Sequence, residues 1–157
     1  MPAEETLAAP AFRPMRPADL ERVLEIQRSA FAHPWSRELM AREMAHEWSS
    51  VLLAVEPAAG GEAVTGVVVF WLVHDELHVL NVAVAPEARR RGVARALMRE
   101  AERRGAERGA RLATLEVRRS NQAALELYRS LGYRRVGLRP RYYAEEGEAA
   151  IVMERAL

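Results

Sequence analysis

Residues 80–98 read LNVAVAPEARRRGVARALM, and within them the spacing of the apolar residues changes from that of a strand to that of a helix. The β-branched run ends at Pro86, and after it Val93 and Leu97 recur one helical turn apart. Three consecutive arginines and Gly92 stand between the two patterns. The stretch therefore predicts a strand, a short loop and a helix that begins near Gly92.

The start of this helix is a candidate anion site. A helix leaves the backbone N–H groups of its first turn, here within residues 90–95, without partners. These donors and the helix dipole attract an anion, and neighbouring arginine side chains add charge-assisted hydrogen bonds. A pyrophosphate suits this arrangement, and the residues predicted to hold it are Arg89, Arg90, Arg91, Gly92, Val93, Ala94 and Arg95. The alternative is that the arginines form an ordinary solvated basic surface.

Two common phosphate-binding motifs do not match this loop. The P-loop requires a lysine, and lysine is absent from the whole chain. The Rossmann fingerprint requires glycines at positions where Ala94 and Leu97 stand. The loop therefore needs another interpretation.

The sequence on either side predicts a mixed α/β domain. Turn signals at 58–62 (AAGGE) and 74–76 (HDE) separate three apolar runs, which favours an antiparallel meander. Ser36, Ser120 and Asp19 are candidate N-caps of helices. The predicted strands are 12–16, 50–57, 63–73, 77–86, 111–117, 133–139 and 149–156, and the predicted helices are 18–31, 36–48, 92–105 or 92–109, and 120–132. The element order is β-α-α-β-β-β-α-β-α-β-β, which is an α/β (α+β) arrangement.

Composition limits the classes of function. The 157 residues, half of them apolar, fit one domain, predicted at 11–157 after a flexible leader at 1–10. Because 23 basic residues balance 22 acidic ones, no overall field favours nucleic acid. No cysteine is present, the four histidines lack metal-ligand spacing, and no apolar run is long enough to span a membrane. We expect a cytoplasmic protein that binds no metal, nucleic acid or membrane.

Two stretches resemble one family. RRRGVA (89–94) resembles the [QR]-x-x-G-x-[GA] motif of the GCN5-related N-acetyltransferases (GNAT), which hold the pyrophosphate of acetyl-coenzyme A on that loop. LEVRRSNQAALELYRSLGYRRVGLRPRYY (115–143) is most similar to the RimI-type branch, the ribosomal-protein-alanine N-acetyltransferases. The resemblance covers about residues 12–157 and implies a GNAT fold, a mostly antiparallel central sheet flanked by helices.

The resemblance also assigns catalytic roles. Glu116 corresponds to the family's catalytic glutamate, which prepares the acceptor amine either directly or through a water. Spacing alone favours a different interpretation of Glu116, as a surface strand glutamate or one paired with a nearby arginine such as Arg118. Tyr128 corresponds to the general acid for the departing thiolate, although its motif position also suits a core tyrosine. Asn121 resembles the asparagine that binds the pantetheine arm, yet it is also an ordinary helix-start residue.

Backbone groups and the absence of cysteine complete the expected mechanism. In the family, the strand that carries Val82, Ala83 and Val84 splays away from the strand that carries Glu116, and its free backbone groups bind pantetheine. A covalent acyl-enzyme would have to use a serine, and Ser120 is already explained as a cap. The expected reaction is direct transfer in a ternary complex.

The acceptor is less well specified by the sequence. Trp35, Tyr142 and Tyr143 correspond to segments that flank the acceptor in RimI-type enzymes, and Glu145, Glu146 or Glu148 could attract a basic peptide. The alternative for this acidic segment is a solvated hairpin tip. The implied acceptor is the N-terminal amine of a ribosomal protein with N-terminal alanine. A small-molecule amine, a non-catalytic acyl-coenzyme A sensor and an RNA-binding module are the alternative functions.

Overall fold

A computed structural model of the chain describes residues 10–143 and 147–157, and its elements follow the predicted order. The strands are β1 (Ala11–Pro14), β2 (Ser49–Ala58), β3 (Gly61–Val73), β4 (Glu76–Val84), β5 (Leu112–Arg118), β6 (Arg134–Tyr143) and β7 (Glu148–Ala156). The helices are α1 (Leu20–Ala30), α2 (Arg37–Ala45), α3 (Val93–Glu107) and α4 (Gln122–Ser130). Residues 1–9 of the expected leader lie outside the described residues.

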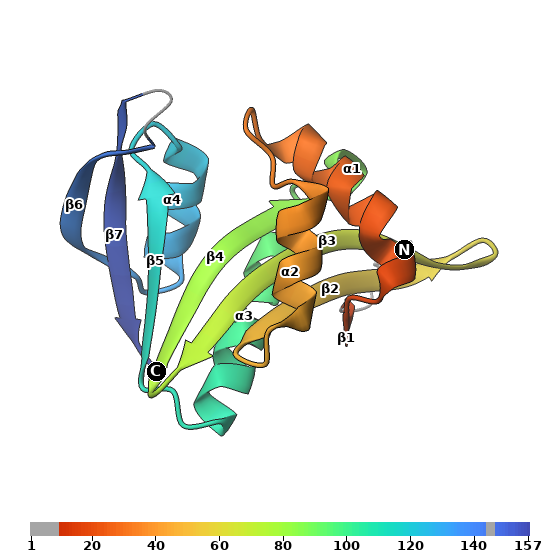
Figure 1. Cartoon of the computed structure of the whole chain (residues 1–157), viewed down its shortest axis with the longest axis horizontal. Coiled ribbons are helices and arrows are strands. Elements are labelled where there is room, and N and C mark those ends of the chain that lie inside the picture. Colours follow the sequence, from red (N-terminus) through yellow and green to blue (C-terminus); the bar gives the residue numbers. More distant parts are fainter. Residues whose placement is uncertain (1–9, 144–146) are drawn as a thin grey trace, which may run out of the picture.

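The strands form one sheet in the order β1-β2-β3-β4-β5-β7-β6. All neighbours are antiparallel except β4 and β5, which are parallel. The predicted meander of β2, β3 and β4 is confirmed, with Gly60 and Gly61 at positive φ in the first turn. Figure 1 shows the consequence: β1–β4 form one arm and β5, β7 and β6 form the other, and the arms meet near the C-terminus.

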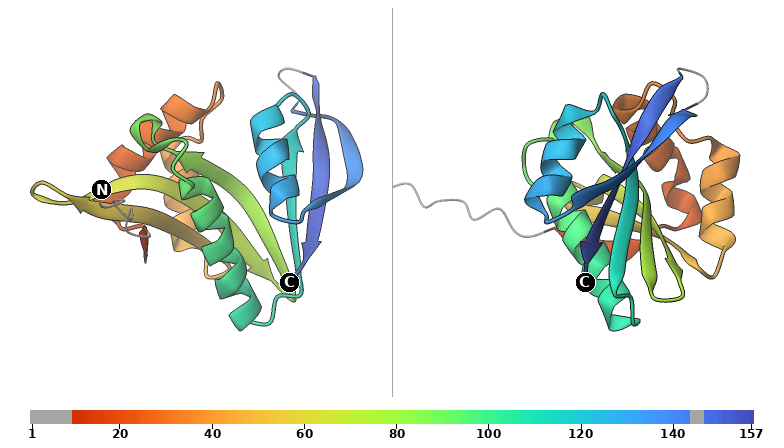
Figure 2. Two further views of the ribbon diagram at one scale, coloured as in Figure 1. Left: turned by 180° about the vertical axis from the view of Figure 1, so that it is seen from behind. Right: turned by 90° about the vertical axis from the view of Figure 1, so that its left-hand side faces the viewer.

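The helices cover both faces of this sheet. α1 and α2 lie on one face, and α3 crosses the opposite face, as Figures 1 and 2 show. The apolar face predicted for α3 is confirmed, because Val93, Leu97 and Met98 are buried. Gly66 of β3 allows this close packing, since a Cβ there would lie 2.9 Å from Cδ1 of Leu97. Within the described ranges, no helix combines the length and apolar character needed to cross a bilayer.

The helix starts confirm one predicted cap and modify another. The hydroxyl of Ser36 accepts a hydrogen bond from the backbone N–H of Leu39 at 3.1 Å, as expected for an N-cap. Asp19 precedes α1, but its side chain accepts from the backbone N–H of Arg16 at 2.8 Å and from the Arg13 guanidinium. Asp19 therefore stands at the N-cap position of α1 as predicted, but its side chain bonds the start of the short 3-10 turn at 17–19 and not the first turn of α1.

Candidate active site

The two arms separate within the parallel pair of strands. β4 and β5 pair only from Glu76–Val79 and Leu112–Leu115, after which β4 continues along β3 and β5 continues along β7. The register of β4 against β3 shifts by one residue at Leu80, so a β-bulge lies at the point of separation. A cavity of about 190 Å³ lies there, lined by Phe31, His33, Trp35, Val79, Leu80, Asn81, Val82, Leu115, Glu116, Val117, Arg118, Asn121, Ala124 and Tyr128.

Glu116 lines this cavity from the half-buried face of β5. Residues on either side of it, Leu115 and Val117, point into the core, which follows from the alternation of a strand. Its carboxylate accepts a hydrogen bond from Nη1 of Arg139 at 2.5 Å, and its side chain keeps 30% of its exposure. Arg118, the partner considered from the sequence, donates instead to Glu148. The carboxylate is therefore oriented by Arg139 while remaining open to the cavity.

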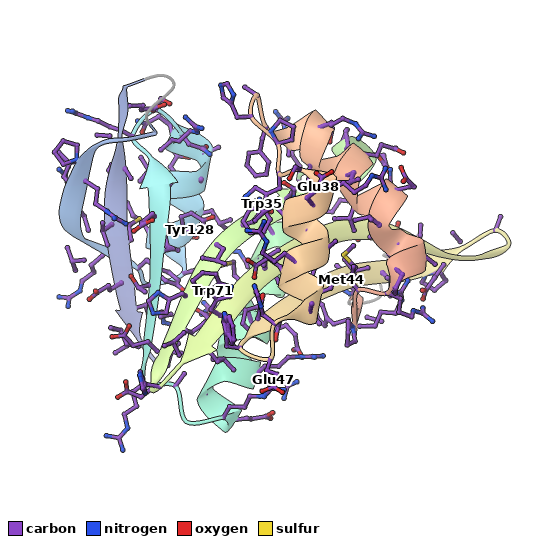
Figure 3. All side chains as sticks on the ribbon, in the orientation of Figure 1. Trp35, Glu38, Met44, Glu47, Trp71 and Tyr128 are labelled. Carbon is purple, nitrogen blue, oxygen red and sulfur yellow. The ribbon has the colours of Figure 1, made fainter. Side chains whose placement is uncertain are left out.

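Tyr128 lines the same cavity from α4, the helix that follows β5. Figure 3 shows it on the side of that arm that faces β4. Its ring meets the ring of Tyr133 edge to face, with centroids 6.0 Å apart. Tyr133 is buried and donates its hydroxyl to Glu102 at 3.0 Å, and this burial raises the pKa of Tyr133. Of these two tyrosines, Tyr128 is the one at the cavity.

The start of α4 corrects one prediction. Asn121, not Ser120, is the N-cap, because its Oδ1 accepts from the backbone N–H of Ala124 at 3.2 Å. The backbone N–H of Ser120 donates to Glu148 at 2.8 Å, a contact across 28 residues that the local sequence does not encode. Asn121 still lines the cavity, so its role toward a pantetheine arm stays a prediction.

A second cavity of about 230 Å³ lies at the start of α3, lined by Val84, Ala88, Arg89, Arg90, Gly92, Val93, Ala94, Arg95 and Leu127. Gly92 is the N-cap with φ +75°, and its carbonyl accepts the first helical hydrogen bond, from Ala96. The N–H groups of Val93, Ala94 and Arg95 therefore have no partner within the helix. No atom lies within 4 Å of the place where a Cβ of Gly92 would stand, so the backbone is open to a ligand.

The four predicted arginines differ in their surroundings. Nη2 of Arg89 donates to the carbonyl of Ser29 at 3.1 Å, and Nη2 of Arg95 donates to the hydroxyl of Ser130 at 2.6 Å. Arg91 lies 3.2 Å from a carboxylate oxygen of Glu56 and is not among the residues that line the cavity. Arg90 lines the cavity at φ +63°, a conformation that costs energy for a residue with a Cβ. These positions favour Arg90 over Arg91 as an anion ligand.

The split gives β4 a free edge. The N–H of Ala85 donates to Thr65 of β3 at 2.8 Å, and the same register pairs Ala83 with Val67. Because alternate residues of an antiparallel strand bond to its neighbour, the backbone groups of Ala83 are directed to β3. Those of Val82 and Val84 are directed away from β3, toward the split. The geometry therefore favours Val82 and Val84 over Ala83 as backbone partners of a ligand.

The acceptor residues are described in part. Trp35, labelled in Figure 3, lies in the loop between α1 and α2. It lines the first cavity together with Phe31 and His33 of the same loop. Tyr142 and Tyr143 belong to β6, and their side chains lie outside the described part of the chain. Glu145 and Glu146 also lie outside it. Hydrogen bonds from Ser120 and Arg118 hold the pKa of Glu148 below its ordinary value, so this carboxylate is already engaged.

The sequence interpretation missed a buried amide pair behind the first cavity. Nε2 of Gln27 donates to Oδ1 of Asn81 at 2.6 Å, and Nδ2 of Asn81 donates to Oε1 of Gln27 at 3.0 Å. Gln27 is 0% exposed and Asn81 is 8% exposed. A signal was available in the sequence: Gln27 and Asn81 are polar residues at positions where the periodicity of α1 and of β4 predicts apolar ones. Leu127, Phe31 and His33 carried no such signal.

Comparison with known proteins agrees with this geometry. The sequence profile of the acetyltransferase (GNAT) family matches residues 20–133. The chain belongs to this family. The GNAT fold and an acetyl-coenzyme A-dependent N-acetyltransferase activity, both expected from the two motifs, are confirmed by this membership and by the relatives described next.

The relatives of this GNAT chain include enzymes of the RimI type. The ribosomal protein bS18-alanine N-acetyltransferase of Escherichia coli K12 is 34% identical over 137 residues, covering 86% of this chain and 89% of the relative. The N-alpha-acetyltransferase RimI of Mycobacterium tuberculosis is 36% identical over 143 residues, covering 88% and 87%. The crystal structure of the ribosomal-protein-S18-alanine N-acetyltransferase from Escherichia coli matches with a TM-score of 0.81 at 31% identity, covering 94% of this chain and 93% of that chain.

Proposed function

We propose that this GNAT enzyme transfers acetyl from acetyl-coenzyme A to the N-terminal α-amine of a ribosomal protein, with N-terminal alanine as its preferred acceptor. The observation that carries the proposal is that Glu116 and Tyr128, from two different elements, line one cavity at the split of β4 and β5. The relatives named for ribosomal-protein-alanine acetylation support the choice of acceptor. Such an acceptor also supports a cytoplasmic location.

The residues of the second cavity suit the phosphates of coenzyme A. The free N–H groups at the start of α3 and the guanidinium of Arg90 supply donors and positive charge to one opening. Val84 lines this cavity and Val82 lines the first, so the free edge of β4 connects them. A pantetheine arm lying along this edge would pair with it as an added strand does. Acetyl-coenzyme A supplies the activated acetyl group.

Glu116 and Tyr128 move the two protons of the reaction. An α-ammonium group loses its proton near pH 7.7 to 8.0 in reference peptides, so at neutral pH a modest base suffices. Glu116 takes this proton, directly or through a water, and the amine nitrogen forms its bond to the acetyl carbon as the carbon–sulfur bond breaks. Tyr128 gives its hydroxyl proton to the departing sulfur, and the second proton that the nitrogen loses as it becomes an amide restores the Tyr128 hydroxyl. One N–C bond forms and one C–S bond breaks, and no acyl-enzyme is needed.

The lining of the first cavity favours a peptide over a polycationic small amine. Among the described residues, Glu116 is the one acidic side chain that lines the cavity, and it is already engaged by Arg139. Aromatic side chains from the loop between α1 and α2, Phe31 and Trp35, supply much of the opposite wall. A non-catalytic sensor would require neither Glu116 nor Tyr128 at the cavity.

Coenzyme A release with peptides that begin with Ala, Ser or Met, or that offer only an internal Lys, tests the proposal. We expect turnover of the Ala-initiated peptide, and a loss of about a hundredfold or more in Glu116→Gln and in Tyr128→Phe. Tyr133→Phe and Glu154→Gln are matched controls, because neither residue lines the cavity, and both should retain most of the activity. Turnover limited to the internal-Lys peptide, or unchanged in both cavity variants, would contradict the proposal.

A further inference from the structure

The buried pair of Gln27 and Asn81 joins the two walls of the first cavity. Asn81 lines the cavity on β4, directly after the bulge at Leu80. Gln27 lies in α1 and does not line the cavity, and its side chain bonds Asn81 through two hydrogen bonds. Its backbone carbonyl accepts the last hydrogen bond of α1, from the N–H of Phe31 at 3.1 Å, and Phe31 begins the loop on the opposite wall. One residue therefore contacts both walls.

We infer that Gln27 is a positioning residue: its side-chain hydrogen bonds to Asn81 fix the end of α1, and with it the acceptor loop that begins at Phe31, relative to the bulged strand. This inference deepens the proposed function and rests on it for the identity of the acceptor. A planar amide that both donates and accepts permits one register of α1 against β4, whereas an apolar contact tolerates sliding. Because both amides are buried, removing one of them leaves the other without a hydrogen-bond partner, which costs free energy.

The consequence for catalysis is a separation of two properties. The anion cavity at the start of α3 is built from other residues, so the phosphates of coenzyme A should still bind when the pair is lost. The distance between the acceptor amine and the acetyl carbon depends on both walls of the first cavity. Because misplacement by about 1 Å can cost about a hundredfold in rate, loss of the pair should lower kcat more than it lowers cofactor affinity.

The experiment compares Gln27→Met and Gln27→Glu with Thr65→Val. Methionine keeps the unbranched shape and removes both hydrogen bonds, whereas glutamate keeps an acceptor for Nδ2 of Asn81. Thr65 is the matched control: it is 3% exposed, its hydroxyl donates to the carbonyl of Ala54 at 3.2 Å, and it lines neither cavity. The readouts are melting temperature, coenzyme A affinity by calorimetry, and kcat with the Ala-initiated peptide.

We expect Gln27→Met to lower kcat by about tenfold or more and to weaken coenzyme A binding by a smaller factor, and we expect Gln27→Glu to recover part of the loss in kcat. Thr65→Val should lower the melting temperature and leave kcat unchanged. If Gln27→Met lowers the melting temperature as Thr65→Val does and keeps its kcat, the pair is structural only and the inference is wrong.

A second readout separates this inference from the choice of acceptor. Amide hydrogen exchange can be followed at Phe31 and at Asn81, whose N–H is directed to β3, without any peptide. In Gln27→Met these amides should exchange faster than in wild type, while the amides of β2 remain protected. Unchanged exchange at both walls would overturn the inference even if no peptide is turned over by the wild type. Absence of peptide turnover with faster exchange would reject the acceptor alone.

Discussion

Gly66→Ala should loosen the packing of α3 and weaken cofactor binding together. The added Cβ would lie 2.9 Å from Cδ1 of Leu97, 3.0 Å from Cγ1 of Val93 and 3.1 Å from the carbonyl oxygen of Ala83. Since carbon atoms pack best at about 3.5–4.0 Å, neighbours on both sides must move by about 0.5–1 Å. Overpacking of this kind costs about 1–3 kcal/mol, and for a chain of this length each kcal/mol lowers the melting temperature by about 2–4 °C.

The same displacement reaches the anion site. Val93 is the first residue of α3 and lines the second cavity, so shifting it misplaces the free N–H groups of that turn. Thermal unfolding should show a decrease of about 2–12 °C in melting temperature, and calorimetry should show weaker binding of coenzyme A. Gly137→Ala in β6 is the control, because the nearest atom to its added Cβ is 3.9 Å away, and it should change stability by less than about 0.5 kcal/mol. Wild-type stability and affinity in Gly66→Ala would refute the reasoning.

Three further predictions concern single side chains. Gly92→Ala should destabilise the protein by about 1–2 kcal/mol, because φ is +75° at the start of α3. Chemical denaturation measures this loss, and an unchanged free energy of unfolding would contradict the prediction. Arg90→Ala should weaken coenzyme A binding by about tenfold or more, and less so at high salt, whereas Arg91→Ala should change it little; equal losses in titrations of both variants would contradict the assignment. Asp19→Asn should flatten the dependence of stability on acidic pH. Hydrogen bonds from Arg13 lower the pKa of Asp19, so the ionised carboxylate stabilises the folded state. This stabilisation is complete above the ordinary carboxyl pKa near 3.9 and is lost as pH falls through the lowered pKa. Denaturation curves with the same acid slope in Asp19→Asn and wild type would refute this last prediction.

Much of the fold could be predicted because its signals are local. The turn glycines, the change of period after Pro86 and the Ser36 cap each depend on a few neighbouring residues, and each was confirmed. The Ser120 cap was wrong because α4 begins at Gln122, one residue later than expected, and Ser120 bonds instead to a carboxylate 28 residues away. Asn121, one position later, then caps α4. A local pattern proposes both residues as caps, and the tertiary contact chooses between them.

The candidate site divides in the same way. The sequence by itself determined the strand–loop–helix unit with Gly92 and its arginines, because backbone conformation and the free donors of a first helical turn are local properties. Only the tertiary structure decided that Arg91 turns to Glu56, that Arg139 holds Glu116 and that Gln27 pairs with Asn81. These partners lie 35, 23 and 54 residues apart. Side chains so distant in sequence meet only where packing of the sheet and helices brings them together, and no periodicity records that choice.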